Sequence, residues 1–290
     1  MSNDIKAAMT EEQRIEHDDE YQNLLALFIA LLTSLNSNEM EEALYALSEL
    51  RTEYAFNHLI KGFDIDYENA MQLLLSKDDS NLTLYEKDLR DRLIVGIENL
   101  ISFSVCEEYQ LYNEVIESVG DDEIDYDSDE YEELLSLCEK YNDNYALIEN
   151  GDIEYAAVVA SSWIKASSSD YFVYWTQNDA KVRPWHMELQ GYAAHRDEFP
   201  SWMIPPIEYN CRCFLQVLDV PFAKADIHQI KGSIKDLKKP KQLSDVYSES
   251  LAKCGRIFGP SHSYFAVKEK DKEMLGRFVS RLKEKYYAET

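Results

Sequence analysis

The chain has 290 residues, which is enough for one large domain or two ordinary ones, and its apolar content is that of a globular protein. Its charge is unevenly distributed. Residues 1–150 hold 37 Asp and Glu against 9 Lys and Arg, a net charge of −28, whereas residues 151–290 have a net charge of +2. This asymmetry indicates two parts with different surroundings, and it argues against binding of free duplex DNA by the N-terminal half.

The N-terminal half is predicted to be almost wholly helical, because its apolar residues recur every three or four positions and no proline precedes Pro184. The expected helices are one that begins at the capping box of Thr10 and Gln13 and ends near Asn36, one from Asn38 to Gly62, a short one over Tyr67–Leu75, one from about Leu82 to Val119 that Gly120 ends, and one from Glu130 to Glu149 that Gly151 breaks.

The acidic residues of this half have two interpretations. They keep the protein soluble, or they form a DNA-mimic surface that docks onto a basic partner. The run from Asp121 to Glu130 is interpreted as a solvated loop, because a calcium-binding loop needs a central glycine and a bidentate glutamate that do not fall in place here.

The C-terminal half differs in composition and pattern, with runs of aromatic and β-branched residues between turn residues. The expected elements are a helix over Ile153–Lys165, a strand over Tyr171–Thr176, a short helix over Asp179–Leu189 with Pro184 in its first turn, a loop over Gly191–Tyr209, a strand over Cys211–Val220 that Pro221 stops, a Lys-rich connector over Lys224–Lys241, and a helix over Lys270–Tyr287.

These elements predict the α+β class. We expect an N-terminal acidic helical domain over residues 1–150, a small α+β module with a short sheet over residues 151–221, and a basic connector with a C-terminal helix over residues 222–290.

The cysteines indicate a reducing compartment. There are five of them: Cys106, Cys138, Cys211, Cys213 and Cys254. An odd number without a paired framework is typical of free thiols in a cytosol. No basic stretch followed by an apolar one opens the sequence, and the longest apolar run, Leu24–Leu32, is too short to span a bilayer. We therefore expect a protein that is made in the cytoplasm and does not contact a membrane.

A candidate zinc site is formed by His186, Cys211 and Cys213, with His195 or Glu208 as a fourth ligand. Zinc prefers four N, S or O donors in a tetrahedron, and two cysteines one residue apart on a strand point to the same face. Zinc is the one cofactor that the sequence suggests. The alternative is that the cysteines are small buried residues and His186 is a hydrogen-bonded core histidine.

A second constellation consists of Asp179, Arg183, His186 and Arg212. His186 as a general base and an arginine on a phosphate would suit phosphate ester chemistry. The alternative is a structural network in which Asp179 caps a helix and pairs with Arg183 or Arg212.

Four apolar side chains in the loop region are candidates for a partner-binding patch: Trp185, Phe199, Trp202 and Met203. They suit equally well a small core that covers the sheet.

The last 70 residues form a basic stretch with a net charge of +6, in which Lys235, Lys238, Lys239 and Lys241 cluster. Such a stretch contacts a DNA backbone, is simply solvated, or neutralises the acidic half within the molecule.

The segment from Tyr174 to Cys213 resembles the signature of the Mu F-like minor head proteins of tailed phages, also called the phage head-morphogenesis domain. The residues that carry the resemblance, in order, are Tyr174, Trp175, Asp179, Arg183, His186, Gly191, Pro205, Pro206, Asn210, Cys211, Arg212 and Cys213. The similarity covers roughly residues 153–218, and Glu208 stands where many relatives carry a histidine.

The resemblance implies a virion or procapsid component, present in few copies, that acts near the portal in head morphogenesis or DNA packaging. Its partners would be a portal or capsid protein and, through the basic tail, packaged DNA; no catalysis is required. Two other functions are compatible with the residues: a nuclease-like or toxin-like effector that uses Asp179, Arg183 and His186, and an acidic DNA-mimic inhibitor.

Overall fold

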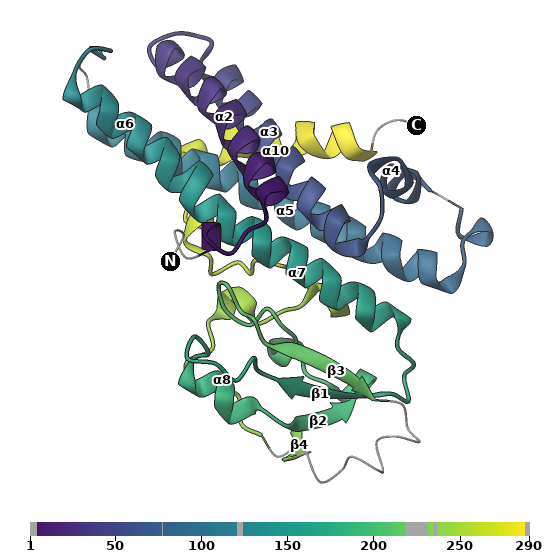
Figure 1. The fold of residues 1–290 in the computed structure, drawn as a ribbon. Helices are drawn as coiled ribbons and strands as arrows, with labels where there is room; N and C mark the ends of the chain where they lie inside the picture. The colour runs from purple at the N-terminus through teal and green to yellow at the C-terminus, as the bar shows by residue number, and fades with distance from the viewer. Residues whose placement is uncertain (1–4, 77, 121–123, 219–230, 235–236, 288–290) are drawn as a thin grey trace. The chain divides into compact units, whose positions relative to one another are not determined.

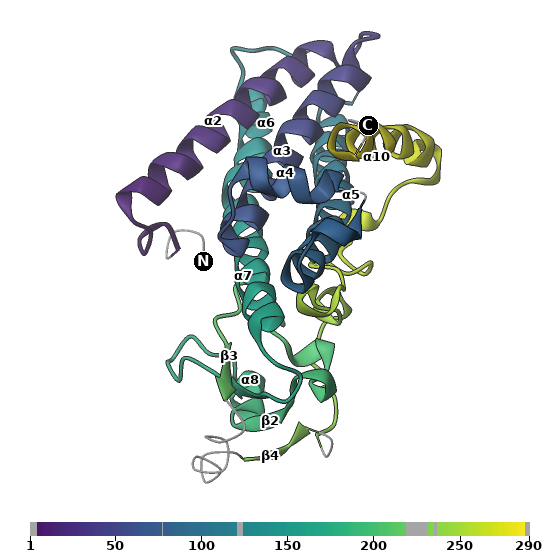
Figure 2. The same ribbon diagram turned by 90° about the vertical axis from the view of Figure 1, so that its right-hand side faces the viewer.

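The computed structural model describes residues 5–76, 78–120, 124–218, 231–234 and 237–287. Figures 1 and 2 show the fold from two sides. The chain divides into two compact units. Unit 1 comprises Met1–Asn57, Leu100–Gly151 and Ser263–Thr290, and unit 2 comprises His58–Asn99 and Asp152–His262. The expected domains at residues 1–150, 151–221 and 222–290 stay a prediction.

The α+β class is confirmed: a largely helical N-terminal region precedes a small mixed sheet. Among the described residues, no helix combines the length and the apolar character that crossing a bilayer requires.

The helices of the N-terminal half begin and end at recognisable local signals. Helix α2 (Glu11–Ser34) starts at the capping box, where the Gln13 amide donates to Thr10 Oγ1 at 3.2 Å and the Thr10 amide donates to Gln13 Oε1 at 2.9 Å. Helix α4 (Tyr67–Leu75) has the predicted bounds and is capped by Asp66. Helix α5 (Leu84–Val119) ends at Gly120, whose φ of 62° places it in the left-handed region.

Two glycines that were expected to end helices lie inside them instead. Helix α3 (Met40–Phe63) passes through Gly62 and ends at Asp64, which has a φ of 59°. Gly62 is needed for close packing, because a Cβ there would overlap the carbonyl oxygen of Glu154 and lie 2.7 Å from the Cβ of Ala157. Gly151 lies within helix α7 at an exposed position with nothing around it, so the helix tolerates it.

Helix α6 (Asp129–Glu139) continues into α7 (Ala146–Lys165) through a π-helical turn over Lys140–Tyr145. The expected break at residue 151 is therefore wrong, and one helical rod replaces two expected helices. The start of the acidic loop, residues 121–123, lies outside the described residues.

Helix α10 (Lys272–Tyr287) packs on α3 within unit 1. Phe278 and Tyr286 make edge-to-face contacts with Tyr45 and Phe56, at centroid distances of 5.5 and 5.2 Å. An ion-pair ladder flanks these contacts, and its pairs are Arg277–Glu41, Arg281–Glu42, Lys285–Glu49 and Lys285–Glu53. The basic side chains of α10 thus neutralise acidic ones of α3, one of the three roles considered for the basic stretch.

Unit 2 contains the sheet, in the strand order β3-β1-β2-β4. Strand β1 (Tyr171–Trp175) pairs antiparallel with β2 (Tyr192–His195) and β3 (Phe214–Leu218), and β2 pairs parallel with β4 (Gly232–Ser233). The register places Trp175 opposite Phe214, and Tyr171 opposite both Leu218 and His195. Strands β2 and β4 lie where only a loop and a connector were expected. Residues 219–230 and 235–236, with Pro221 and Lys235, lie outside the described residues.

The core of unit 2 forms where α7 covers β1. Trp163 stacks on Phe172 at a centroid distance of 4.4 Å, and Phe199 meets both rings edge-on at 6.2 Å. Phe199 and Met203 are fully buried, which favours for these two residues the alternative of a small core over a docking patch. Trp185 and Trp202 are half-buried.

Candidate metal centre

Helix α8 (Pro184–Leu189) positions the histidine of the expected zinc site. Arg183 precedes the helix with an extended backbone, and Pro184 takes its first position, where a missing N–H costs no hydrogen bond. One turn of helix then directs His186 into the interior, where its side chain is 1% exposed. The helix is shorter than expected, because residues 179–183 form turns rather than its first turn.

The two cysteines reach the same place from the segment that precedes β3. Strand β3 begins at Phe214, so the expected strand over Cys211–Val220 is wrong at its start, and neither cysteine is held by the sheet ladder. Asn210, with a φ of 53°, turns the chain immediately before Cys211. Both cysteine side chains are nevertheless buried and lie together with His186.

Helix α7 fixes this turn from the other side. Both carboxylate oxygens of Asp152 accept from the Asn210 amide at 3.0 Å, and the Tyr247 hydroxyl donates to Asp152 at 3.0 Å. The hydroxyl of Tyr155, one helical turn further along α7, donates to the carbonyl oxygen of Cys213. Partly buried hydrogen bonds therefore hold the backbone of the cysteine segment in place.

The donor atoms have a spacing that suits one metal ion. His186 Nδ1 lies 3.2 Å from Cys213 Sγ and 3.9 Å from Cys211 Sγ, and all three donor atoms lie within 4.8 Å of one another. Zinc–sulfur and zinc–nitrogen bonds of about 2.3 and 2.0 Å in a tetrahedron place donors roughly 3.5–3.8 Å apart. The three residues therefore fit zinc, and they form the one such cluster found in the described ranges.

Glu208 contacts the opposite side of the imidazole ring. Its Oε2 lies 3.2 Å from His186 Nε2 and 3.0 Å from Arg183 Nε. A carboxylate on Nε2 fixes the ring orientation and leaves Nδ1 to face the thiols, which is the usual task of an outer partner of a metal-bound histidine. The structure thus places Glu208 behind the ligand rather than in the ligand set.

His195 is not brought to this cluster. It lies opposite Tyr171 at the far end of β1, stacked on that ring at 3.9 Å, with its Nδ1 3.2 Å from the Ser169 carbonyl oxygen. Trp175 marks the other end of β1, next to the cysteine segment. Four residues of strand span about 13 Å, so the expectation that His195 is a fourth ligand is wrong.

A buried hydroxyl adjoins the cysteines. Burial and the neighbouring thiols raise the pKa of Tyr174, and its hydroxyl faces the Cys213 sulfur. A hydroxyl in this position can donate to a metal-bound thiolate or to a water molecule that completes the tetrahedron.

The two thiols differ in acidity. The Cys211–Cys213 hydrogen bond holds the pKa of Cys213 below its usual value, and Tyr174, Arg183 and Arg212 contribute in the same direction. The same hydrogen bond, together with burial, raises the pKa of Cys211. Cys213 is therefore the more acidic of the two thiols, and a metal ion that binds both must displace the proton of Cys211 against its raised pKa.

The second group of candidate residues, Asp179, Arg183, His186 and Arg212, forms ion pairs and hydrogen bonds within the fold. Arg212 pairs with Asp179 at 2.7 Å at the surface, and this contact lowers the pKa of Asp179. Arg183 pairs with Glu208 and also donates to the carbonyl oxygen of Tyr209 at 2.9 Å. The network alternative is therefore confirmed for Arg212, although Asp179 lies before the helix and does not cap it.

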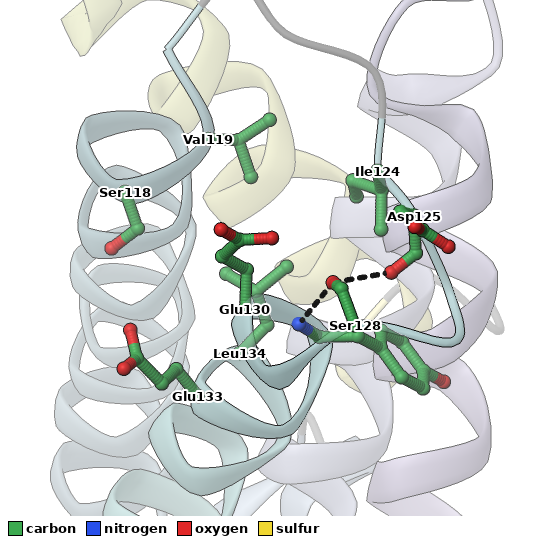
Figure 3. Close-up of a pocket in the computed structure, with 9 residues that line it drawn as sticks. Ser118, Val119, Ile124, Asp125, Ser128, Glu130, Glu133 and Leu134 are labelled. Carbon is green, nitrogen blue, oxygen red and sulfur yellow. Dashed lines mark hydrogen bonds between the residues drawn. The ribbon is translucent and has the colours of Figure 1, made fainter.

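A separate depression lies beside the start of α6 in unit 1 (Figure 3). Val119, Ile124 and Leu134 form its apolar lining, and Glu130 and Glu133 add carboxylates. Ser128 caps α6 by accepting from the Tyr131 amide at 3.3 Å. The depression is acidic, and no group in it points to a particular ligand.

Comparison of the chain with protein-family models, curated proteins and solved structures found no match. The fold and the site alone define this molecule as an α+β protein with a buried His–Cys–Cys cluster.

Proposed function

We propose that this protein is a minor head protein of a tailed phage: a structural component of the virion or procapsid that binds a portal or capsid protein during head morphogenesis or DNA packaging. The proposal rests on the ordered signature between Tyr174 and Cys213 and on the way in which its residues interact.

The interactions among signature residues carry the proposal. Asp179 pairs with Arg212, His186 contacts Cys213, and Arg183 donates to the backbone next to Asn210. Residues far apart in the signature thus contact one another in the fold. A motif whose members hold one another in place is what a binding module needs, because a rigid scaffold reduces the entropy lost on association.

The same geometry argues against the nuclease alternative. A general base needs an accessible ring nitrogen, whereas His186 is 1% exposed and both of its ring nitrogens face protein groups. Asp179 and Arg212 are half-exposed and neutralise each other at the surface.

Trp202 offers the clearest test of docking, because it is half-exposed and lies outside the metal cluster. Binding of the purified chain to purified portal and capsid proteins should weaken at least tenfold in Trp202→Ala, since aromatic side chains dominate interface energies. Val158→Ala, which removes an exposed apolar side chain from α7, is the matched control and should bind normally.

A nuclease assay on the same preparations separates the two functions. We expect no turnover of single- or double-stranded nucleic acid. Turnover that disappears in His186→Ala while the variant stays folded would replace the structural role with the enzymatic one.

A further inference from the structure

A cluster of charged side chains lies buried in unit 1, independent of the metal cluster and of the proposed function. Arg51 of α3 and Glu107 of α5 are 0% exposed, with Arg51 Nε 2.8 Å from Glu107 Oε2. Arg51 also contacts Glu149 of α7 at 3.3 Å and donates to Asn150 Oδ1 at 2.9 Å. Glu108 of α5 is equally buried and accepts from Asn142 at 3.3 Å.

The cluster is unbalanced in charge. Three buried glutamates, Glu107, Glu108 and Glu149, surround one buried cation, so full ionisation would leave an excess of two negative charges away from water. Burying an unpaired carboxylate is so costly that such a group takes up a proton instead.

Hydrogen bonding in the cluster is incomplete if the glutamates are ionised. Oε1 of Glu107, Oε1 of Glu108 and the side-chain oxygen of Asn142 are buried without a hydrogen-bond donor within the described residues, and Oε2 of Glu107 has only its ion pair with Arg51. A proton on Glu107 gives it an O–H that donates to Glu149, its carboxylate neighbour. A proton on Glu108 supplies a further O–H donor to a cluster in which several buried oxygens lack one.

Arg51 is the one cation that acts on the three glutamates in the described part of the chain. The other titratable groups that face the cluster are Glu20 of α2, Cys138 of α6, Tyr141 of the π-helical turn and Tyr264. Within the described part of the chain, these glutamates do not bring three ligand atoms close enough together to hold a metal ion, so protons are the simpler counter-charge.

We propose that unit 1 folds around bound protons: Glu107 holds one that it shares with Glu149, and Glu108 holds a second that it releases to solvent in mild alkali, so that the helical packing loosens as the pH rises. The π-helical turn carries Asn142 against Glu108. Such turns concentrate at functional positions in helices, and this one links the state of the proton to the α6–α7 rod.

The pH dependence follows from the acidity of Glu108. Burial raises its pKa from 4.5 to about 8. A carboxyl with a raised folded-state pKa stabilises the fold fully below 4.5 and loses this contribution as the pH rises toward 8. Between pH 6 and pH 9 the unfolding equilibrium constant should therefore increase roughly a hundredfold through this residue alone.

The test is urea unfolding of the full chain at pH 6 and pH 9, followed by circular dichroism. We expect the wild type to show the increase and Glu108→Gln, which mimics the protonated side chain, to lose most of it. Glu132→Gln, at an exposed position of α6, is the matched control and should behave as the wild type.

Infrared spectroscopy of the wild type at pH 7 tests the same idea without a variant. A band of buried protonated carboxyl groups that disappears at high pH supports the proposal even if Glu108→Gln fails to fold. Absence of this band, an unchanged pH dependence in Glu108→Gln, or recovery of stability at pH 9 on addition of divalent cations would each overturn it.

Discussion

The two glycines inside helices provide a matched pair of substitutions with opposite expected effects. In Gly62→Ala, the new Cβ overlaps the Glu154 carbonyl oxygen and approaches Ala157 Cβ to 2.7 Å, so α3 and α7 must move apart. In Gly151→Ala, the new Cβ meets nothing within 4 Å. Backbone atoms cannot move aside as a flexible side chain can, so only the first variant strains the packing.

The magnitudes follow from two known effects. Overpacking costs about 3 kcal/mol at the upper end of its usual range. Replacing a helical glycine by alanine contributes about 1 kcal/mol of stability. The expected result is a net loss of about 2 kcal/mol for Gly62→Ala and a gain of about 1 kcal/mol for Gly151→Ala.

Urea unfolding provides the measurement, with tryptophan fluorescence as the probe of unit 2, because all four tryptophans lie in it. Circular dichroism should show normal helix content for both variants in the absence of urea. Equal midpoints for the two variants, or a Gly62→Ala protein at least as stable as the wild type, would refute the close approach of α3 and α7.

Three further predictions concern the metal centre, the C-terminal helix and the buried arginine. Protein prepared without chelator should contain about one zinc per chain, and Cys211→Ser should lose the zinc and destabilise the fold around the His–Cys–Cys cluster. Metal analysis that finds no zinc would make His186, Cys211 and Cys213 ordinary core residues. Phe278→Ala should lower the free energy of unfolding in urea by about 3–5 kcal/mol, because the side chain is buried. Arg281→Ala removes a charge from the exposed ion-pair ladder and should change stability little, and less still in high salt. A larger loss in Arg281→Ala than in Phe278→Ala would contradict the packing of α10. Arg51→Met should cost about 3–5 kcal/mol at pH 7 and less at lower pH, where the one negative charge that remains on the Glu107–Glu149 pair is neutralised by a second proton. A loss independent of pH would contradict the buried cluster.

The sequence predicted helices and strands best where a capping or turn residue coincides with the spacing of the apolar residues. Helix α4 has the predicted bounds, since Asp66 supplies a cap and the apolar residues keep a helical spacing. Strand β2 was missed because four residues following a glycine, two of them alanine, carry almost no β signal. Gly62 and Gly151 were misjudged because a glycine marks either a helix end or a close approach, and only tertiary packing distinguishes the two.

The sequence predicted the candidate metal ligands but not the residues that hold the cysteine segment in place. His186, Cys211 and Cys213 stood out because few other residue types bind zinc. Asp152 and Tyr155 come from a helix about 60 residues earlier in the chain, and nothing local in sequence links them to the cysteine segment.

The buried cluster of unit 1 was also missed, although the sequence carried a signal for it. Glu107 and Glu108 lie between Val105 and Leu111, which belong to the apolar stripe of α5, so charged residues interrupt a buried face there. In a half with 37 acidic residues, solvation was the simpler interpretation of each one.

The composition of phage particles tests the proposed function most directly. The proposed function predicts that quantitative mass spectrometry of procapsids and mature heads, purified from a phage that carries the gene, will find the chain in both at a few copies per particle. A parallel preparation in which Cys211→Ser replaces the wild-type chain should contain less of it, because the proposed docking module contains the His–Cys–Cys cluster. Absence of the wild-type chain from both particles would contradict the account.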